Sequence, residues 1–181
     1  MPGFIIFFQT HFAPIFFNME IYEATKNDLS ADGQCFIIST DRPKIDIAFV
    51  HDYLCNESYW AKNIPIDMVK KSIEGSVCFA IYHHDQQAVS ADRQVGFARV
   101  ITDHATFGYL ADVFIAEEFR GKGLSKWMMQ CIIDHPQLQG FRRWMLATKD
   151  AHGLYAQFGF KPLDKPERIM RWAPFDEYPG N

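Results

Sequence analysis

The sequence predicts a mixed α/β fold of the α+β kind, with helices packed on both faces of one β-sheet. Candidate strands cluster in the first half of the chain, and a strand–helix–strand–helix–strand order follows in the second half. The length of 181 residues suits one domain with one substantial core, and hydrophobic residues make up 48% of the chain. Aromatic residues account for 15%, with 17 Phe, so we expect a packed globular protein.

The first half of the chain is interpreted as strands with two helices inserted among them. We expect the helices over residues 44–54 and Ile66–Glu74, separated by a segment that contains Tyr59, Trp60 and Pro65. The apolar, β-prone segments are expected to be strands, over Cys35–Ser39, 77–83, 94–102 and 106–116. The polar stretch 84–93 is a loop or hairpin connection, and Asp103-His104 is the turn signal between the last two strands.

The hydrophobic period becomes helical after residue 123. Apolar side chains then recur at i, i+3, i+4, i+7 and i+8, which places them on one face of a helix. This stripe consists of Leu124, Trp127, Met128, Cys131 and Ile132. Pro136 ends the helix, because proline cannot donate the next backbone hydrogen bond.

The rest of the chain predicts a strand, a short helix and a return to strand. We expect the strand over 143–148 and a helix that Thr148 or Asp150 caps and Gly159 ends. Residues 160–173 are expected to form one or two further strands.

The N-terminal residues 1–18 are expected to be a dispensable extension, followed by a single domain over residues 19–181. This stretch is rich in Phe and Ile, but Pro2, Gln9, His11 and Pro14 interrupt it. It lacks the basic flank of a secretory signal and is too short and broken for a membrane span. We therefore expect no membrane partner.

The composition also limits the partners. The formal net charge of −4 and pI of about 5.9 argue against nucleic acid as an obligate partner and favour a cationic small substrate such as an amine. The four cysteines show no CxxC spacing, so we interpret them as small buried hydrophobes and expect no metal. Free thiols without an export signal indicate a cytoplasmic protein.

The segment from Asp112 to Ser125 carries the main chemical signal. A strand ends, a glycine-containing loop turns, and a helix begins, which presents free backbone N–H groups to an anion. Gly121 and Gly123 let a ligand approach the backbone, and the neighbouring Arg120 and Lys122 add positive charge. The anion implied is a phosphate or pyrophosphate, although a plain strand-to-helix turn has the same appearance. The Walker and Rossmann glycine patterns are absent.

Two motifs in this order give the chain a family resemblance. Arg120-x-x-Gly123-x-Ser125 resembles the GNAT cofactor signature Arg/Gln-x-x-Gly-x-Gly/Ala, with Ser125 in place of the commoner Gly or Ala. The downstream segment AHGLYAQFGF, residues 151–160, resembles the A-x-x-LY-x-x-x-GF segment of the same family. The chain is similar to a bacterial subgroup of small uncharacterised N-acetyltransferases, over residues 77–162 in sequence and 35–76 in layout.

The resemblance implies a centrally splayed sheet that binds acetyl-CoA as a co-substrate. Free backbone groups of Val113, Phe114 and Ile115 would bind the pantetheine arm and the acyl carbonyl. The N–H groups of the next loop would hold the pyrophosphate, and they belong to Arg120, Gly121, Lys122, Gly123, Leu124 and Ser125. Tyr155 would donate a proton to the leaving thiolate. The alternative for Tyr155 is an aromatic core residue on a short helix.

The general base is less well indicated. The segment YLADVFI, residues 109–115, is similar to the YLEDFFV strand of diamine acetyltransferases, with Ala111 at the position of their active-site Glu. Asp112 is a candidate base or substrate-binding residue, a structural hydrogen-bonding group being the alternative, and water-relayed deprotonation is equally open. Tyr59 and Trp60 follow the first helix, where proteins of this fold usually form the acceptor pocket. The alternative is that they pack between the two helices as hydrophobic residues.

These expectations lead to one main function and two alternatives. The main one is acetyl transfer from acetyl-CoA to a primary amine, a small molecule, by direct attack in a ternary complex. The first alternative is a non-catalytic acyl-CoA-binding sensor or interaction module, because the Glu at residue 111 is absent. The second keeps the chemistry but takes a protein lysine or N-terminal amine as acceptor. The resemblance also implies a homodimer as one possible assembly.

Overall fold

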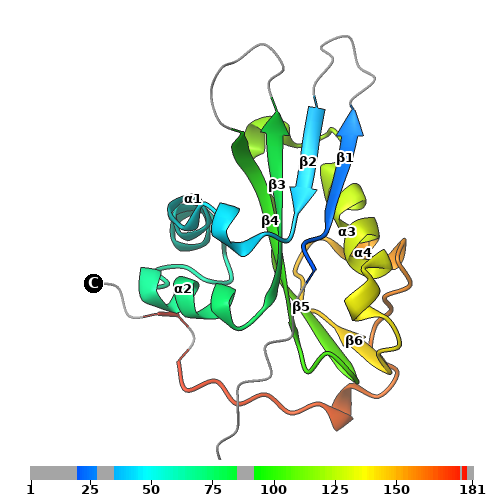
Figure 1. Cartoon of the computed structure of the whole chain (residues 1–181). Helices are drawn as coiled ribbons and strands as arrows, with labels where there is room; N and C mark the ends of the chain where they lie inside the picture. The colour runs from blue at the N-terminus through cyan, green and yellow to red at the C-terminus, as the bar shows by residue number, and fades with distance from the viewer. Residues whose placement is uncertain (1–19, 28–34, 85–91, 176, 179–181) are drawn as a thin grey trace, which may run out of the picture.

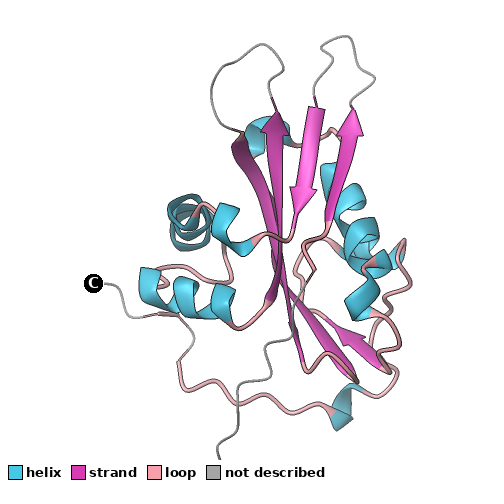
Figure 2. Cartoon of the chain, in the orientation of Figure 1, coloured by secondary structure: helices cyan, strands magenta, loops and turns pink. Residues whose placement is uncertain are grey.

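The structure is a computed structural model that describes residues 20–27, 35–84, 92–175 and 177–178, so the expected extension over 1–18 lies outside the described residues. One six-stranded sheet runs through the middle, with its strands in the order β1 to β6 (Figures 1 and 2). The strands are β1 Glu23–Asn27, β2 Cys35–Ser39, β3 Val77–His84, β4 Arg93–Thr102, β5 Phe107–Ile115 and β6 Arg143–Met145. Neighbours from β1 to β5 are antiparallel, whereas β6 runs parallel to β5.

Helices cover both faces of this sheet (Figure 1). On one face lie α1 Ile47–Asp52, a π-helical continuation Tyr53–Glu57, and α2 Ile66–Glu74. On the other face lie α3 Leu124–Asp134 and α4 His152–Ala156. Short 3-10 turns complete the described chain, at Arg42–Lys44, Glu117–Phe119, Pro136–Leu138 and Pro166–Arg168. The predicted mixed α/β fold with helices on both faces is therefore confirmed.

Strand β3 shows how the sequence fills the two layers. Its residues from Val77 to Tyr82 are all buried, and successive side chains point to opposite faces. Val77, Phe79 and Ile81 join the core beneath α3, while Cys78, Ala80 and Tyr82 join the core beneath α1 and α2. A strand that is apolar at every position belongs in the middle of a sheet that is covered on both sides.

Strands β5 and β6 separate after a short parallel contact. Their pairing is limited to three residue pairs, from Phe107 with Arg143 to Tyr109 with Met145. Beyond Tyr109, β5 continues to Ile115, and no described residue pairs with it on the β6 side. The sheet is thus splayed at this point, as the family resemblance implied.

A β-bulge lies in the free half of β5. Phe97 pairs with Phe114 and Arg99 with Ala111, so two residues of β5, Asp112 and Val113, stand opposite the single Ala98. Asp112 has φ 54°, in the left-handed region that Asp tolerates better than most residues. The bulge changes which side chains of β5 face the opening.

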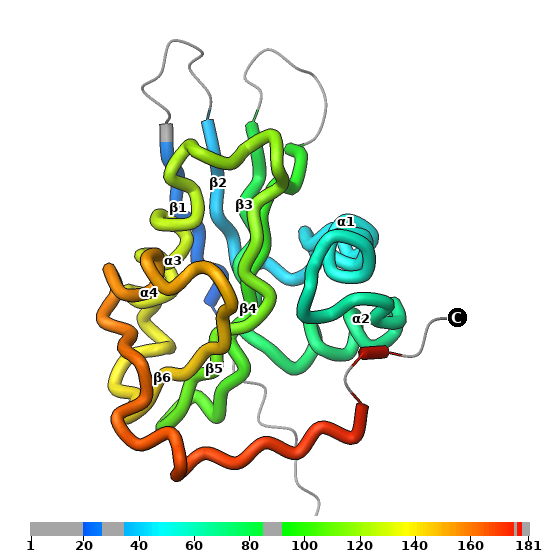
Figure 3. The backbone as a smooth tube through the Cα atoms, turned by 180° about the vertical axis from the view of Figure 1, so that it is seen from behind, coloured from blue at the N-terminus to red at the C-terminus, as the bar shows by residue number. Residues whose placement is uncertain are grey.

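Two sequence predictions about the C-terminal part are corrected by the structure. Residues 160–173 form no strand, only the 3-10 turn Pro166–Arg168, because Pro162 and Pro166 lack the N–H that a strand ladder needs. Strand β6 ends at Met145, three residues earlier than expected. The C-terminal segment instead crosses one end of the sheet, from α4 towards α2 (Figure 3).

The other helix and strand boundaries agree closely with those predicted from the sequence, with two exceptions. The helix expected over 44–54 begins at Ile47, because Pro43 lies in a preceding 3-10 turn and the Asp46 side chain accepts the cap hydrogen bond from the Phe49 N–H. Strand β1 was not predicted, since its alternation of charged and small residues, EATKN, gives no apolar run.

Within the described ranges, no helix is both long and apolar enough to cross a membrane, and no three metal-ligating side chains gather into a group. All four cysteines lie in the described part of the chain and are free thiols. Cys35, Cys78 and Cys131 are buried, as predicted.

Candidate active site

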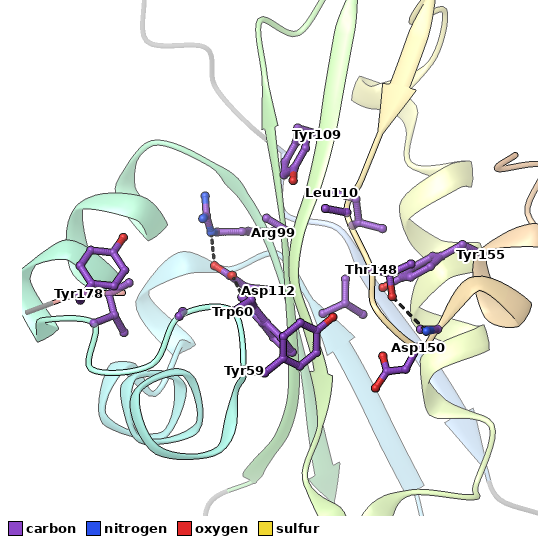
Figure 4. Close-up of a pocket in the computed structure, with 16 residues that line it drawn as sticks. Tyr59, Trp60, Arg99, Tyr109, Leu110, Asp112, Thr148, Asp150, Tyr155 and Tyr178 are labelled. Atoms are coloured by element: carbon purple, nitrogen blue, oxygen red, sulfur yellow. Dashed lines mark hydrogen bonds and ion pairs between the residues drawn. The ribbon is translucent and has the colours of Figure 1, made fainter. Parts of the chain in front are cut away.

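A cleft of about 320 Å³ opens where β5 and β6 separate (Figure 4). Its walls come from β4 and β5, the loop from β6 into α4 together with α4 itself, the loop before α2, and the C-terminal segment. The side chains that matter for chemistry are Tyr59, Trp60, Arg99, Asp112, Asp150, Tyr155 and Tyr178. The structure therefore brings together four residues that the sequence proposed separately, namely Tyr59, Trp60, Asp112 and Tyr155.

Asp112 is held on both carboxylate oxygens. Arg99 Nε donates to Oδ2 at 2.5 Å, and the Trp60 indole N–H donates to Oδ1 at 3.0 Å. The Arg99 and Asp112 side chains are only 16% and 9% exposed, so this ion pair is largely shielded from water. Such an arrangement supports the structural alternative for Asp112, because its charge is balanced and its acceptor positions are used.

Tyr59 and Trp60 form the wall that faces α4. The Tyr59 hydroxyl accepts a hydrogen bond from the backbone N–H of Lys149 at 2.9 Å, and the Lys149 ammonium lies 5.6 Å from the centre of the Tyr59 ring. The two rings meet edge to face at 5.0 Å. They remain 52% and 41% exposed, so a large part of each aromatic surface is open to a ligand.

Tyr155 lies on α4 and is only 8% exposed. Burial, with smaller contributions from Tyr59 and Asp150, raises the pKa of Tyr155 to about 12. The phenol is therefore protonated at neutral pH, which is the state that a proton donor needs. None of the described residues makes a hydrogen bond with its hydroxyl.

The expectation that Thr148 or Asp150 caps α4 is wrong, because its N-cap residue is Ala151 and no side chain caps its first turn. Thr148 Oγ1 instead accepts a hydrogen bond from the Ala151 N–H at 3.0 Å, in the loop before the helix. Asp150, the other candidate, makes no such bond and lines the cleft (Figure 4).

The loop between β5 and α3 has the geometry of an anion site. Gly121 and Gly123 have φ 78° and 73°, and α3 begins after Gly123 with no side-chain cap on its N-terminus. A Cβ at Gly121 would meet no atom within 4 Å. Within the part of the chain that the structure describes, the N–H groups at this helix N-terminus have no side chain as a partner, and the helix dipole favours a negative group there. The predicted residues Lys122, Leu124 and Ser125 all belong to this turn.

Arg120 acts differently from its neighbours in this loop. Its Nε donates to the Ile115 carbonyl at 3.1 Å and its guanidinium donates to the Tyr53 hydroxyl at 3.1 Å. The Tyr53 ring in turn stacks on Phe114 at 3.7 Å. The Arg120 side chain therefore fixes the loop to β5 and the π-helical segment. Its backbone N–H donates to the Glu117 carbonyl at 3.1 Å, so the N–H groups that follow Arg120 are the ones open to an anion.

A second cation reaches the loop from β1. The ammonium of Lys26 lies 3.5 Å from the position that a Cβ of Gly123 would occupy. Sequence reasoning missed it, because β1 was not predicted and nothing in the sequence links residue 26 to residue 123. Arg99, Asp150 and Tyr178 were also missed as cleft residues. For Asp150 a signal existed, since an acidic residue preceded a predicted short helix close to Tyr155.

The comparisons with known proteins agree with this geometry. The family description "Acetyltransferase (GNAT) domain" matches residues 74–162. A relative from Gibberella zeae, "Putative acetyltransferase FG08082", is 31% identical over 137 residues, which are 67% of this chain and 76% of the relative. The chain belongs to the GNAT acetyltransferase family. The family resemblance seen in the sequence is thereby confirmed.

Solved structures extend this result to the fold. A GNAT-family acetyltransferase structure from Xanthomonas campestris pv. campestris is 46% identical, with a TM-score of 0.69, over 77% of this chain and 94% of that one. A predicted acetyltransferase from Clostridium acetobutylicum, solved with acetyl-CoA, has a TM-score of 0.55 at 10% identity over 85% of this chain and 96% of its own, and so shows a shared fold. GNAT acetyltransferases in general take the acetyl group from acetyl-CoA.

Proposed function

We propose that this GNAT acetyltransferase moves an acetyl group from acetyl-CoA to the primary amine of a small molecule, by direct attack in a ternary complex. The observation that carries the proposal is the shared cleft. One wall is the partner-free half of β5, which leads into the anion loop, and the other wall holds the protonated Tyr155.

The donor side fits acetyl-CoA by its chemistry. The uncapped α3 N-terminus, the open Cβ position at Gly121 and the nearby Lys26 ammonium suit a pyrophosphate. On the side of β5 away from β4, the segment from Val113 to Ile115 has no strand partner among the described residues, so backbone groups there can bond the pantetheine amides. The Ile115 carbonyl is already used by the Arg120 Nε. In the bound state the thioester supplies the acyl carbon and a thiolate leaving group.

Tyr155 would supply the proton that the leaving thiolate needs. Its side chain is buried and lines the cleft, and its hydroxyl is protonated at neutral pH and is not hydrogen-bonded within the described residues. A proton donor in this position assists the departure of sulfur as the amine attacks.

A covalent acyl-enzyme does not fit the cysteines. Burial raises the pKa of Cys78 to about 12 and also raises that of Cys131, so both are thiols and poor nucleophiles at neutral pH. No cysteine lines the cleft. Direct attack by the amine is the simpler route. The free thiols also support the cytoplasm as the location, where cysteines stay reduced.

Calorimetric titration with acetyl-CoA, coenzyme A and ATP tests the donor side first. We expect saturable binding of acetyl-CoA and none of ATP, followed by release of coenzyme A when primary amines are added. No binding of acetyl-CoA would contradict the proposal. Binding without turnover of any small or peptide amine would favour the sensor alternative.

A further inference from the structure

Asp150 is a carboxylate in the cleft that has no bonding partner among the described residues. It lines the opening from the loop that leads into α4, and no described residue forms a hydrogen bond or ion pair with it. Asp150 does not cap α4, and the Ala151 N–H donates to Thr148 Oγ1 and not to the Asp150 carboxylate. Its two oxygens are therefore available to a ligand.

The charges around the cleft leave Asp150 uncompensated. Among the described lining residues, the other charged side chains are Arg99 and Asp112, which neutralise each other. Lys149, the residue before Asp150, places its ammonium over the Tyr59 ring. The cleft thus carries one excess negative charge, which favours a cationic ligand.

Aromatic surface surrounds this charge. Tyr59 and Trp60 are about half exposed, and in Figure 4 the Tyr59 ring lies beside Asp150 at the mouth of the cleft. The hydrogen bond from the Lys149 N–H to the Tyr59 hydroxyl fixes that proximity. A carboxylate beside aromatic rings is a typical setting for an ammonium group, because both attract positive charge.

Asp150 also lies near the proposed proton donor. Its negative charge contributes to the raised pKa of Tyr155, which places the two groups within electrostatic reach of one another. The amine nitrogen and the thioester sulfur must lie on different sides of the acyl carbon during transfer. Two separate groups, one for each atom, suit that geometry.

We propose that Asp150 binds the ammonium group of the acceptor and takes its proton before attack, and that the acceptor is a small primary alkylamine. This inference rests on the proposed acetyl transfer. It assigns the acceptor proton to Asp150, while Asp112 remains in its ion pair with Arg99 and shapes the wall.

The proton balance of the step is complete. The ammonium gives one proton to Asp150, which passes it to water, and the nitrogen lone pair then forms the C–N bond. The C–S bond breaks, and the thiolate takes the Tyr155 proton. The new amide nitrogen loses a second proton, which returns to the Tyr155 phenolate through water. One proton is released for each amide formed.

The test compares two acceptors of the same shape and different charge. n-Butylamine is an ammonium ion at pH 7.5, whereas O-propylhydroxylamine is neutral there and needs no deprotonation. The variants are Asp150→Asn and, as a control, Asp164→Asn, which removes an exposed charge from the C-terminal segment outside this cleft. Since no residue in the described ranges bonds the Asp150 side chain, we expect the Asn variant to fold normally.

We expect Asp150→Asn to lower kcat/KM for n-butylamine about 100-fold, the usual scale of lost proton transfer. This loss should shrink as the pH rises and the free amine accumulates. Turnover of O-propylhydroxylamine and the Kd for acetyl-CoA should stay within about 2-fold of wild type, as should every value for the Asp164→Asn control.

Three results would overturn the inference. The first is an unchanged kcat/KM for n-butylamine in Asp150→Asn, and the second is an equal loss of activity with both acceptors. The third is a wild-type protein that acetylates O-propylhydroxylamine but not n-butylamine. A wild-type protein that does not bind acetyl-CoA would instead overturn the proposed function. A protein that binds acetyl-CoA and acetylates neither compound would remove the alkylamine acceptor and Asp150's role with it.

Discussion

The donor side and the acceptor side of the cleft share strand β5 but consist of different chemical groups. The donor side consists of backbone, namely the free half of β5 and the N–H groups after Gly121 and Gly123. It is continuous in sequence from residue 113 to 125. The acceptor side consists of side chains that come from several segments far apart in the sequence, from Tyr59 to Tyr178.

This difference between backbone and side chains determines which side of the cleft can change its ligand by substitution and which cannot. A backbone site depends on glycine geometry and on a helix terminus, so few substitutions alter its specificity without destroying it. A side-chain site can change its ligand with each substitution. A cleft built in this way can keep the same acetyl donor while substitutions change its amine acceptor.

The largest effect should come from breaking the donor side at Gly123. Gly123→Glu places a carboxylate in the anion turn, at φ 73°, where a side chain is strained. We expect the Kd for acetyl-CoA to rise by more than about 100-fold, measured by calorimetry. Gly140→Glu is the matched control, because Gly140 has φ 79° and lies outside the cleft. Equal loss of binding in both variants would mean that strain alone is responsible.

The next largest effect should be on turnover, from a change at Tyr155, where the donor side and the acceptor side of the cleft meet. Tyr155→Phe is expected to lower kcat by about 10- to 1000-fold and to leave acetyl-CoA binding unchanged. Unchanged turnover in the Phe variant would assign the proton donor to another group.

The pH profile tests the same phenol in the wild-type protein. The pKa of Tyr155 is raised from 10.0 to about 12, so the protonated donor persists throughout the pH range below 10. We therefore expect kcat not to fall between pH 7 and 10 in a steady-state assay. A descending limb centred near pH 8 would indicate a different proton donor.

A substitution in the acceptor wall at Asp112 should lower the stability of the fold, because this residue has a structural role. Asp112→Asn leaves Arg99 partly buried without a counter-charge, and we expect a loss of about 3 kcal/mol in the free energy of unfolding, from urea denaturation. Asp67→Asn breaks the exposed pair with Lys70 and should cost less than about 0.5 kcal/mol. If Asp112→Asn kept full stability and lost turnover, Asp112 would be the base.

A smaller change is expected at Lys26, the cation that reaches the anion loop from β1. Lys26→Ala should raise the Kd for acetyl-CoA by about 3- to 10-fold and reduce its dependence on salt, because one charge near the pyrophosphate is lost. Lys44→Ala, which removes an exposed cation paired with Glu23, should leave the Kd unchanged. Equal effects of the two variants would mean that only net charge matters.

The sequence predicted the donor side better than the acceptor side for a physical reason. Local signals, such as alternation along β3 and the apolar stripe of α3, fix the elements, and the glycine loop is itself a local motif. The ion pair between Arg99 and Asp112 depends on the bulge in β5, and sequence periodicity does not reveal a bulge. The expected C-terminal strands failed because prolines override an otherwise β-prone composition.

The opening between β5 and β6 lies between elements on the two faces of the sheet. The anion loop heads α3 on one face, whereas Tyr59 and Trp60 approach from the side of α1 and α2 (Figures 1 and 4). Two molecules that enter from opposite faces do not compete for an entrance. We expect either substrate to bind first, and coenzyme A to inhibit competitively against acetyl-CoA but not against the amine.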